Sequence, residues 1–408
     1  MRAAPRICCL DLDTFFVSVE RLFDPSLEGK AVVVGGNKGG GGVVLSCSYE
    51  ARVFGVRSGM SIRDASKLAP RAVFLPGRHD EYARYSDGAR AIVERFSPVV
   101  RAASIDEHYV DFHGCERLYR EPGDADDDAT IVRVVCSMTG AIKAELGLPS
   151  SAGIAATKPM AKVASGLAKP CGVRLVPSGT EAATLAPLGV RKLPGIGPVS
   201  EGRLTALGIA TLGELAAAPA ETLRRVFGSH AESIRAAATG GGATSLGRER
   251  PAFREHDPRG ERLGSISNER TFAERSGTET EAILSGLCER VCFRARKRGV
   301  KARTVTLRLR WTDFTTITRS STVDPTHCDL VVRDVVFSLY RRARERPMAV
   351  RLVGVALSNL EGESAQLELF GRDDRRAVAV DEVRERFGYD ALHLAASVRG
   401  DRSRAPDP

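Results

Sequence analysis

Two acidic segments of the chain contain residue types that favour phosphoryl-transfer chemistry. The segment SIDEHYVD places Asp106 and Glu107 side by side in a run that otherwise has the composition of a β-strand. The segment DLDTFF begins at Asp11, directly after the apolar run ICCL. Two strands lying side by side would bring Asp11 to the pair formed by Asp106 and Glu107, and three carboxylates would then converge.

Carboxylates this close together stay ionised in a partly dry site only when cations neutralise them. Hard oxygen ligands select Mg²⁺ or Mn²⁺, so the three side chains predict a two-metal phosphoryl-transfer centre. The alternative is that Asp106 and Glu107 belong to a hairpin turn and that Asp11 merely ends a strand. Either segment taken alone leaves both interpretations open.

Together with two further segments, these motifs resemble a Y-family (translesion) DNA polymerase of the DNA polymerase IV type. The resemblance runs from about residue 6 to the final helix and keeps the family's order. The segments that carry it are DLDTFFVSVE at 11–20, SYEARVFGV at 48–56, SIDEHYVD at 104–111 and KVASGLAKPCG at 162–172. The resemblance implies a DNA-templated polymerase that uses two Mg²⁺ ions, with Mn²⁺ as an alternative, has low fidelity and lacks proofreading.

The resemblance also implies the fold, an α+β multidomain protein with the right-hand architecture of polymerases. Its parts are a palm, small fingers, a helical thumb with a helix-hairpin-helix, and a βαββαβ little finger. The expected boundaries are palm 1–20 and 76–170, fingers 21–75, thumb 171–240, linker 241–262, little finger 263–360 and a C-terminal tail at 361–408.

In this family, the positions that match Asp11, Asp106 and Glu107 are the catalytic metal ligands, and the carbonyl of Leu12 assists them. The position that matches Phe16 is the steric gate. Its aromatic ring packs under the deoxyribose and leaves no room for a 2′-hydroxyl. The other aromatic of the pair is expected to belong to the core.

The positions that match Tyr49, Arg52 and Lys162 bind the triphosphate of the incoming dNTP. A phenol donor and a planar guanidinium one helical turn apart suit phosphate oxygens. A lysine acts on the β and γ phosphates as a point charge. The same alignment places three residues above the templating base: Val43, Leu45 and Gly59.

The sequence departs from the family pattern at two positions near these residues. Thr157 stands where the family usually has Asn, which is expected to weaken a local hydrogen bond while leaving Lys162 in register. His108 stands where the family generally has a small residue. We expect His108 to face outward; an inward side chain would instead perturb the handling of metal or pyrophosphate.

The composition is that of a globular protein with more than one domain. At 408 residues the chain is too long for a single core, and no apolar run approaches the roughly 20 residues of a membrane span. The first apolar run is interrupted at Asp11, so no secretory signal is expected and the predicted location is the cytoplasm. The nine cysteines are expected to be reduced, with Cys288 and Cys292 as half-buried core thiols rather than metal ligands.

The formal net charge of +9 is concentrated in one region. Residues 241–360 contain 23 Lys and Arg against 14 Asp and Glu, which leaves the rest of the chain neutral. Such an excess is typical of a phosphate-binding surface, although a solvated basic face has the same composition.

Alternation in 304–311 places Arg308 and Arg310 on one face of a strand, where they would meet DNA phosphates. The arginine runs at 294–298 and 341–344 are expected to be partly solvated helix ends.

The segment LPGIGP resembles a helix-hairpin-helix, in which Gly195 and Gly197 let backbone N–H groups approach a DNA phosphate. The alternative is a plain turn between helices.

The glycine-rich segment 35–42 lacks the order of a phosphate loop and is expected to be a turn between strands. The acidic loop at 124–128 lacks the pattern of an EF-hand and is expected to be a solvated connector.

The segment QLELF resembles the peptide with which bacterial polymerases dock on the sliding clamp. Gln366, Leu369 and Phe370 are its expected contacts with the clamp. The alternative is that Leu369 and Phe370 pack back on the preceding module. The other expected partners are primer–template DNA and dNTPs, and the chain is expected to be a monomer.

Two other function classes compete with a polymerase. A polymerase-shaped adaptor that grips DNA and the clamp would not need the carboxylates, yet Asp11, Asp106, Glu107 and Lys162 are all present. A nucleotidyl cyclase on a similar palm would need neither a hairpin motif nor a basic module. The sequence therefore predicts a translesion DNA polymerase.

Overall fold

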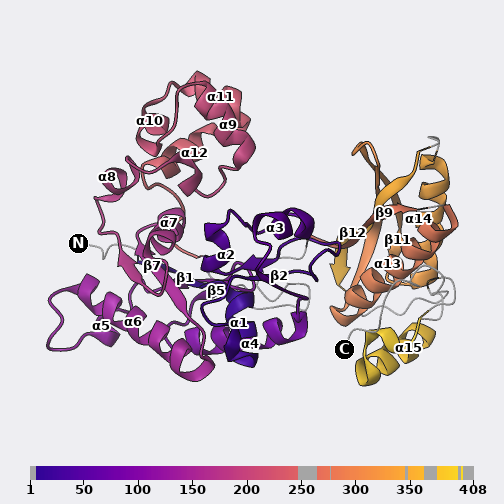
Figure 1. Cartoon of the computed structure of the whole chain (residues 1–408), viewed down its shortest axis with the longest axis horizontal. Helices are drawn as coiled ribbons and strands as arrows, with labels where there is room; N and C mark the ends of the chain where they lie inside the picture. The colour runs from indigo at the N-terminus through magenta and orange to yellow at the C-terminus, as the bar shows by residue number, and fades with distance from the viewer. Residues whose placement is uncertain are drawn as a thin grey trace. The chain divides into compact units, whose positions relative to one another are not determined.

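The computed structural model describes residues 6–246, 264–275, 277–344, 348–362 and 375–393, together with Ser397. The chain forms two compact units, Met1–Glu249 and Arg250–Pro408 (Figure 1). Each unit combines a β-sheet with packed helices, so the expected α+β multidomain class is confirmed. Across the described ranges, no helix is long and apolar enough to span a membrane.

A five-stranded sheet lies at the centre of the first unit, with strands in the order β5-β6-β1-β7-β8. Their bounds are β1 (Ile7–Leu12), β5 (Val100–Ala102), β6 (Glu107–Asp111), β7 (Ser150–Ala155) and β8 (Val173–Leu175). β1 is antiparallel to both neighbours, β6 and β7. Because β1 is central and covered on both faces, its sequence is apolar until Asp11.

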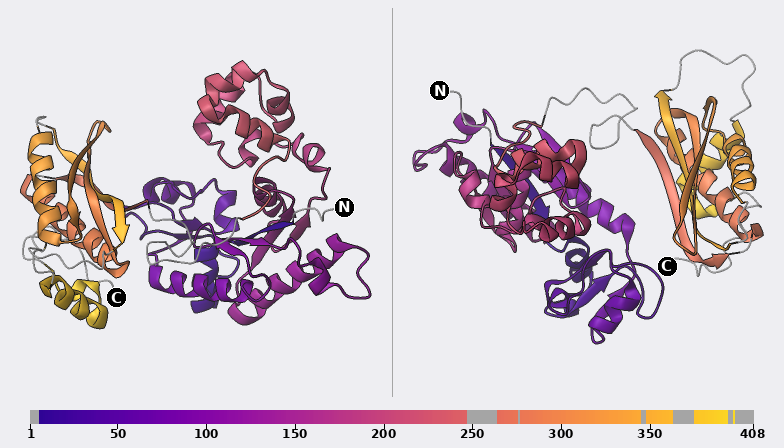
Figure 2. Two further views of the ribbon diagram at one scale, coloured as in Figure 1. Left: turned by 180° about the vertical axis from the view of Figure 1, so that it is seen from behind. Right: turned by 90° about the horizontal axis from the view of Figure 1, so that it is seen from above.

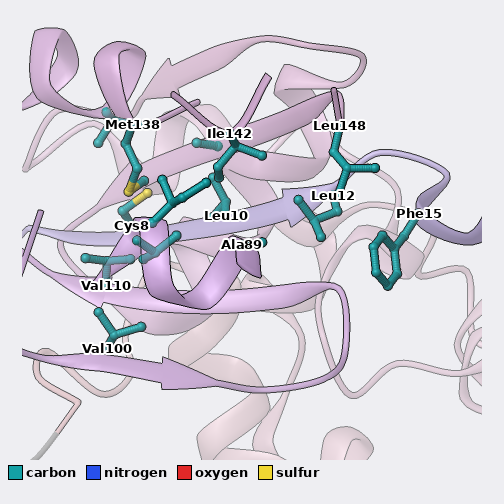
Figure 3. Packing of buried hydrophobic residues seen from close by; sticks show 14 of the residues in the cluster. Cys8, Leu10, Leu12, Phe15, Ala89, Val100, Val110, Met138, Ile142 and Leu148 are labelled. Carbon is teal, nitrogen blue, oxygen red and sulfur yellow. The ribbon is translucent and has the colours of Figure 1, made fainter. Parts of the chain in front are cut away.

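Alternation along β1 separates two cores. The even-numbered residues of β1 pack with α4 (His79–Val93) and α6 (Asp127–Leu146), as Figure 3 shows for part of this cluster. Ile7 and Cys9 pack on the opposite side with α7 (Lys158–Ala168). Asp11 has the same parity as Ile7 and Cys9 and therefore lies on the α7 side of the sheet.

The acidic loop at 124–128 is only partly the solvated connector that was expected, because Asp126 is exposed whereas the Asp124 side chain is 7% exposed. Asp126 caps α6 by accepting a hydrogen bond of 2.8 Å from the N–H of Ala129. Asp124 accepts a hydrogen bond of 2.8 Å from the Arg133 guanidinium, which comes from the next turns of the same helix. These carboxylates hold the start of α6, and a short helix, α5 (Glu116–Tyr119), precedes the loop.

A small three-stranded sheet, in the order β3-β2-β4, also belongs to the first unit, and Val32 and Val34 of β2 share a buried cluster with β1. Its elements are α1 (Phe15–Phe23), η1 (Pro25–Leu27), β2 (Val32–Val34), β3 (Ser46–Cys47), α2 (Tyr49–Val53), α3 (Ile62–Leu68) and β4 (Val73–Leu75). The glycine-rich segment 35–42 connects β2 to β3, as expected. Gly35 has φ 143°, and a Cβ there would lie 2.1 Å from the Val43 carbonyl oxygen, so only glycine fits.

Short helices follow β8 and form a helical region. They are α8 (Glu181–Leu185), η2 (Val190–Lys192), α9 (Pro198–Ala206), α10 (Leu212–Ala217), α11 (Ala220–Phe227), η3 (Gly228–His230) and α12 (Ala231–Ala238). Buried leucines hold them together, among them Leu204, Leu212, Leu215 and Leu223. The helices expected around the LPGIGP segment are therefore present.

The residues after α12 return to the central sheet, although a linker was expected from residue 241. The N–H of Lys158 donates to the Ala243 carbonyl oxygen at 2.9 Å, and the N–H of Leu246 lies 3.4 Å from an Asp111 carboxylate oxygen. Leu246 itself is buried. The glycine-rich composition suggested a linker because it offers few apolar side chains for packing. One buried leucine and two hydrogen bonds nevertheless attach this segment to the first unit.

The second unit has the element order βαββαβ, as expected. Its elements are β9 (Ser265–Arg275), α13 (Gly277–Lys297), β10 (Val300–Trp311), β11 (Thr316–Thr326), α14 (Asp329–Ala343) and β12 (Val350–Gly362). The strands form an antiparallel sheet in the order β11-β10-β12-β9, and α13 and α14 lie on one face of it (Figure 2). The apolar face of β10 is buried under these helices.

The helix α15 (Arg375–Phe387), followed by η4 (Tyr389–Ala391), is attached to α13 by buried ion pairs. Arg384 contacts Glu289 at 2.5 Å, and both side chains are at most 2% exposed. Arg296 contacts Asp381 at 2.6 Å and is only 7% exposed. The arginine run at 294–298 is therefore not simply a solvated helix end, because its central guanidinium is used for internal packing.

The cysteines are all free thiols, as expected. Cys288 and Cys292 on α13 are fully buried rather than half-buried. Burial raises the pKa of both thiols. These residues behave as small core side chains.

Candidate active site

Asp11 and Glu107 lie directly opposite each other on the neighbouring strands β1 and β6. At the same end of the sheet, the N–H of Leu12 donates to the carbonyl oxygen of Asp106 at 2.9 Å. The strand pairing expected from the sequence is therefore confirmed. It brings the two acidic segments, which are far apart along the chain, to the same end of the sheet.

Two lysines neutralise these carboxylates. The ammonium of Lys162, from α7, contacts Glu107, and the ammonium of Lys169 contacts Asp11. Burial raises the pKa of Asp11; Lys169 opposes this shift, whereas Asp106 and Glu107 add to it. Burial disfavours the charged form of Lys162, but Glu107, together with Cys9 and Asp11, outweighs burial and raises the lysine's pKa. The ionised forms of these carboxylates therefore depend on neighbouring positive charge.

Lys169 was not predicted as a site residue. It lies within the segment KVASGLAKPCG, one residue beyond the end of α7, and it also contacts Asp13 at 3.5 Å. The sequence signal was a second lysine seven residues after Lys162. That signal was insufficient to identify Lys169, because helical periodicity does not predict where a side chain beyond the helix end points.

The acidic cluster fits a hard divalent cation by its chemistry. Among the described residues, no group of three or more Asp, Glu, His or Cys side chains is arranged as a metal site. However, Asp11 and Glu107 are paired across β1 and β6, and Asp106 lies at the same end of the strands, so three carboxylates are available there. This is the oxygen donor set that Mg²⁺ and Mn²⁺ prefer, and the lysine contacts show that the set needs compensating charge.

Asp13 joins several parts of the site and was not predicted to do so. Its side chain is 1% exposed and accepts hydrogen bonds from the Ser151 hydroxyl at 2.6 Å and from the Cys171 N–H at 2.8 Å. The Tyr49 hydroxyl also donates to it at 3.3 Å. Asp13 therefore ties the end of β1 to β7, to the segment after α7, and to α2.

The adjacent residues Phe15 and Phe16 have different environments, as expected. Phe15 is buried in the core. Phe16 is partly buried and stacks on Tyr82, with ring centroids 4.2 Å apart and planes inclined by 14°. The ring of His79 meets the Phe16 ring edge-on, with centroids 6.4 Å apart. Phe16 therefore belongs to an aromatic cluster made by α1 and α4.

Tyr49 and Arg52 lie on α2, one turn apart. The Arg52 guanidinium lies 5.1 Å from the centroid of the Tyr49 ring, and the Tyr49 hydroxyl reaches Asp13. Burial and the charge of Asp13 raise the pKa of Tyr49. The structure thus connects Tyr49 to the acidic end of β1.

The residues expected above the templating base come from the small three-stranded sheet region. Val43 is exposed and forms an isolated bridge with Ser61, Leu45 is half-buried, and Gly59 has φ 84°. They remain predictions as contacts with a base.

His108 faces inward, contrary to the expectation. It is 1% exposed, because alternation along β6 turns it to the α4 and α6 side when Glu107 faces α7. Within the described part of the chain, neither ring nitrogen has a hydrogen-bond partner. Burial, together with the charge of Arg90, lowers the pKa of His108 to about 4.

The glycines of the LPGIGP segment lie at the start of α9. Gly195 has φ 94°, a conformation that favours glycine. Gly197 is the N-cap residue of α9, and nothing lies within 4 Å of a Cβ built there. The space beside Gly197 is therefore open, while Pro198, the first residue of the helix, has no N–H to offer.

Arg308 and Arg310 lie on the face of β10 that points away from the helices, as the alternation predicted. Arg308 donates to Glu269 on β9 at 2.9 Å. Arg310 donates to the Thr316 hydroxyl at 2.8 Å. The predicted clamp residues Gln366, Leu369 and Phe370 lie outside the described residues.

The sequence matches known families in two regions. Residues 10–166 match the impB/mucB/samB family, and residues 264–369 match the impB/mucB/samB family C-terminal domain. DNA polymerase IV of Dehalococcoides mccartyi is 37% identical over 401 residues, which cover 97% of this chain and 98% of the relative. DNA polymerase IV of Streptomyces coelicolor is 39% identical over 385 residues, or 91% of this chain and 74% of the relative.

Solved structures share the fold. A Y-family DNA polymerase chimera superposes with a TM-score of 0.71 at 22% identity, covering 88% of this chain and 100% of that one. An insertion ternary complex of Dbh DNA polymerase superposes with a TM-score of 0.59 at 22% identity, with the same coverage.

Proposed function

The chain belongs to the impB/mucB/samB family of Y-family DNA polymerases, and we propose that it extends primers on DNA templates, including damaged ones, by two-metal nucleotidyl transfer. It is a DNA-directed DNA polymerase. The alignment with relatives named DNA polymerase IV over almost the whole of both chains supports this function. We assign the palm to 1–20 and 76–170, the fingers to 21–75, the thumb to 171–240 and the little finger to 263–360.

The carboxylates of Asp11, Asp106 and Glu107, with the Leu12 carbonyl, would hold two Mg²⁺ ions. Such ions lower the pKa of a primer 3′-hydroxyl and neutralise the charge of a triphosphate. In the free protein, Lys162 contacts Glu107. When the substrate enters, Lys162 leaves this carboxylate and binds the β and γ phosphates, so that its positive charge stays compensated.

Two side chains of α2 and one of α1 would position the nucleotide. Tyr49 donates its hydroxyl to a phosphate oxygen, and Arg52 offers its planar guanidinium to the triphosphate. Phe16, supported from behind by Tyr82, forms the wall that excludes a 2′-hydroxyl. The small size of the fingers supports low fidelity, because a short lid encloses the nascent base pair loosely, and we assign no segment to proofreading.

The duplex would be held without regard to sequence. The N–H groups at Gly195 and Gly197 would approach one phosphate, and Arg308 and Arg310 would approach others. The peptide that contains Gln366, Leu369 and Phe370 would dock on the sliding clamp.

The placement of Asp11 opposite Glu107, with Lys162 against that pair, is the observation that carries the proposal. The test is primer extension with Mg²⁺ by the wild type, by Asp106→Asn, and by Asp80→Asn as a control at an exposed carboxylate of α4. We expect only Asp106→Asn to abolish extension while DNA binding persists. A wild-type protein that binds primer–template but never extends it would be an adaptor instead.

A further inference from the structure

One face of the sheet in the second unit is not covered by α13 or α14, and we call it the open face. It is defined here by six residues: Thr304, Thr306, Arg308 and Arg310 on β10, Gly354 on β12 and Glu269 on β9. Two of these residues are threonines and one is a glycine, so the two arginines and the glutamate are its prominent groups.

Arg308 and Glu269 reach each other across an intervening strand. The register places Arg308 opposite Gly354 and Gly354 opposite Glu269, so the three residues form one row across β10, β12 and β9. Arg308 donates to Glu269 at 2.9 Å over the glycine. A Cβ at position 354 would lie 2.7 Å from the Cγ of Glu269, so the ion pair depends on a residue without a side chain.

The two arginines of the open face differ in their charge compensation. Arg308 faces a carboxylate. In the part of the second unit that is described, the partner of Arg310 is the hydroxyl of Thr316, a neutral acceptor. Arg310 therefore offers an uncompensated positive charge to a ligand, whereas the charge of Arg308 is cancelled.

We propose that Arg308 is a phosphate subsite that Glu269 occupies in the free protein, so that DNA must displace this carboxylate to use it. The proposal rests on the proposed DNA-binding function of this face. A carboxylate and a phosphate offer a guanidinium the same kind of anionic oxygen acceptors. The pair is open to solvent, with side chains 42% and 37% exposed, and such pairs are weak enough for a competing anion to replace them. Glu269 thereby lowers the affinity for the duplex.

The test measures binding of the full chain to primer–template DNA by fluorescence anisotropy at several salt concentrations. Glu269→Gln keeps the shape of the side chain and removes its charge. We expect it to tighten binding roughly two- to fivefold at low salt. The slope of log affinity against log salt should change little, because Arg308 neutralises the same phosphate in both complexes.

Two comparisons make the result specific. Asp334→Asn removes one negative charge from α14, on the other side of the sheet, and should leave binding unchanged. In an Arg308→Ala background, Glu269→Gln should no longer tighten binding, because the subsite that it frees is absent.

Unchanged or weaker binding by Glu269→Gln would overturn the proposal and make Glu269 a positioning partner of Arg308. An equal gain from Asp334→Asn would also overturn it, since the effect would then be one of net charge. Wild-type binding and primer extension, measured in the same preparation, test the proposed function independently. Their loss would reject the polymerase assignment, whereas a failure limited to Glu269→Gln rejects only this inference.

Discussion

The ring of Phe16 rests face to face on the ring of Tyr82, with centroids 4.2 Å apart and planes inclined by 14°. Tyr82 is itself fixed, because its hydroxyl donates to Glu20 at 2.6 Å and Glu20 is 1% exposed. Glu20 also accepts from Arg78 at 2.5 Å. One buried carboxylate thus sets the position of the aromatic wall formed by Phe16.

Replacing Phe16 with Ala should raise the incorporation of ribonucleotides relative to deoxyribonucleotides, because the removed ring is what a 2′-hydroxyl would strike. Single-nucleotide insertion with both nucleotide classes measures the ratio. Phe15→Leu is the matched control: it changes a buried core ring and should lower stability without altering sugar selectivity. Unchanged selectivity in an active Phe16→Ala variant would return Phe16 to the core.

Changing Asp11 to Asn should abolish primer extension while DNA binding persists. The substitution removes one charge from the acidic cluster and leaves the helical region and the second unit untouched. Extension and anisotropy measured on the same preparation check this expectation. Extension close to that of the wild type would remove Asp11 from the metal site.

His108 should make the first unit sensitive to acid. Its pKa is about 4 in the folded protein and 6.5 when exposed, so the unfolded state binds a proton first as the pH falls. Stability is therefore lost between about pH 6.5 and pH 4, and the loss from pH 7 to pH 5 is about 2 kcal/mol. His108→Leu should remove this loss and, by removing two unpaired nitrogens, should raise stability at pH 7 by about 1–3 kcal/mol.

Chemical unfolding of wild type and His108→Leu at pH 7 and pH 5, with a chelator present, measures the difference. His113→Gln serves as the control because His113 is exposed. If His108→Leu and the wild type lose equal stability on acidification, another group causes the acid sensitivity.

The paired change of Arg308 and Arg310 to Ala should weaken binding to every DNA sequence. It should also flatten the dependence of log affinity on log salt by roughly one to two. Duplexes of different sequence and a salt series check both expectations. A loss confined to one sequence would contradict contact with phosphates.

Changing Leu369 and Phe370 to Ala should leave extension of a bare primer unaltered and abolish its stimulation by the sliding clamp. The apolar pair would act as the anchor of a short docking peptide, with Gln366 at the rim. Extension assays with and without clamp measure the two activities. An equal fall in both, or a loss of thermal stability, would place the pair in the fold.

The element order and the meeting of the two acidic segments were predictable from the amino-acid sequence. An apolar run ending at Asp11 needs a central strand, and the pleat then fixes which residues share a face. The same rule placed Arg308 and Arg310 opposite the apolar face of β10. The alternation of apolar and polar residues within a strand predicts which side chains share a face, because this alternation depends on the strand's own backbone and not on its neighbours.

The pairing of the charged and polar groups, in contrast, could be known only from the folded chain. Lys169 meets Asp11 from 158 residues away, Arg296 is buried against Asp381 on α15, and Glu269 reaches Arg308 over Gly354. His108 is buried because α4 and α6 cover its side of the sheet. A charged side chain has no periodic signature of its partner, so its role depends on which distant segment the fold brings within a few ångströms.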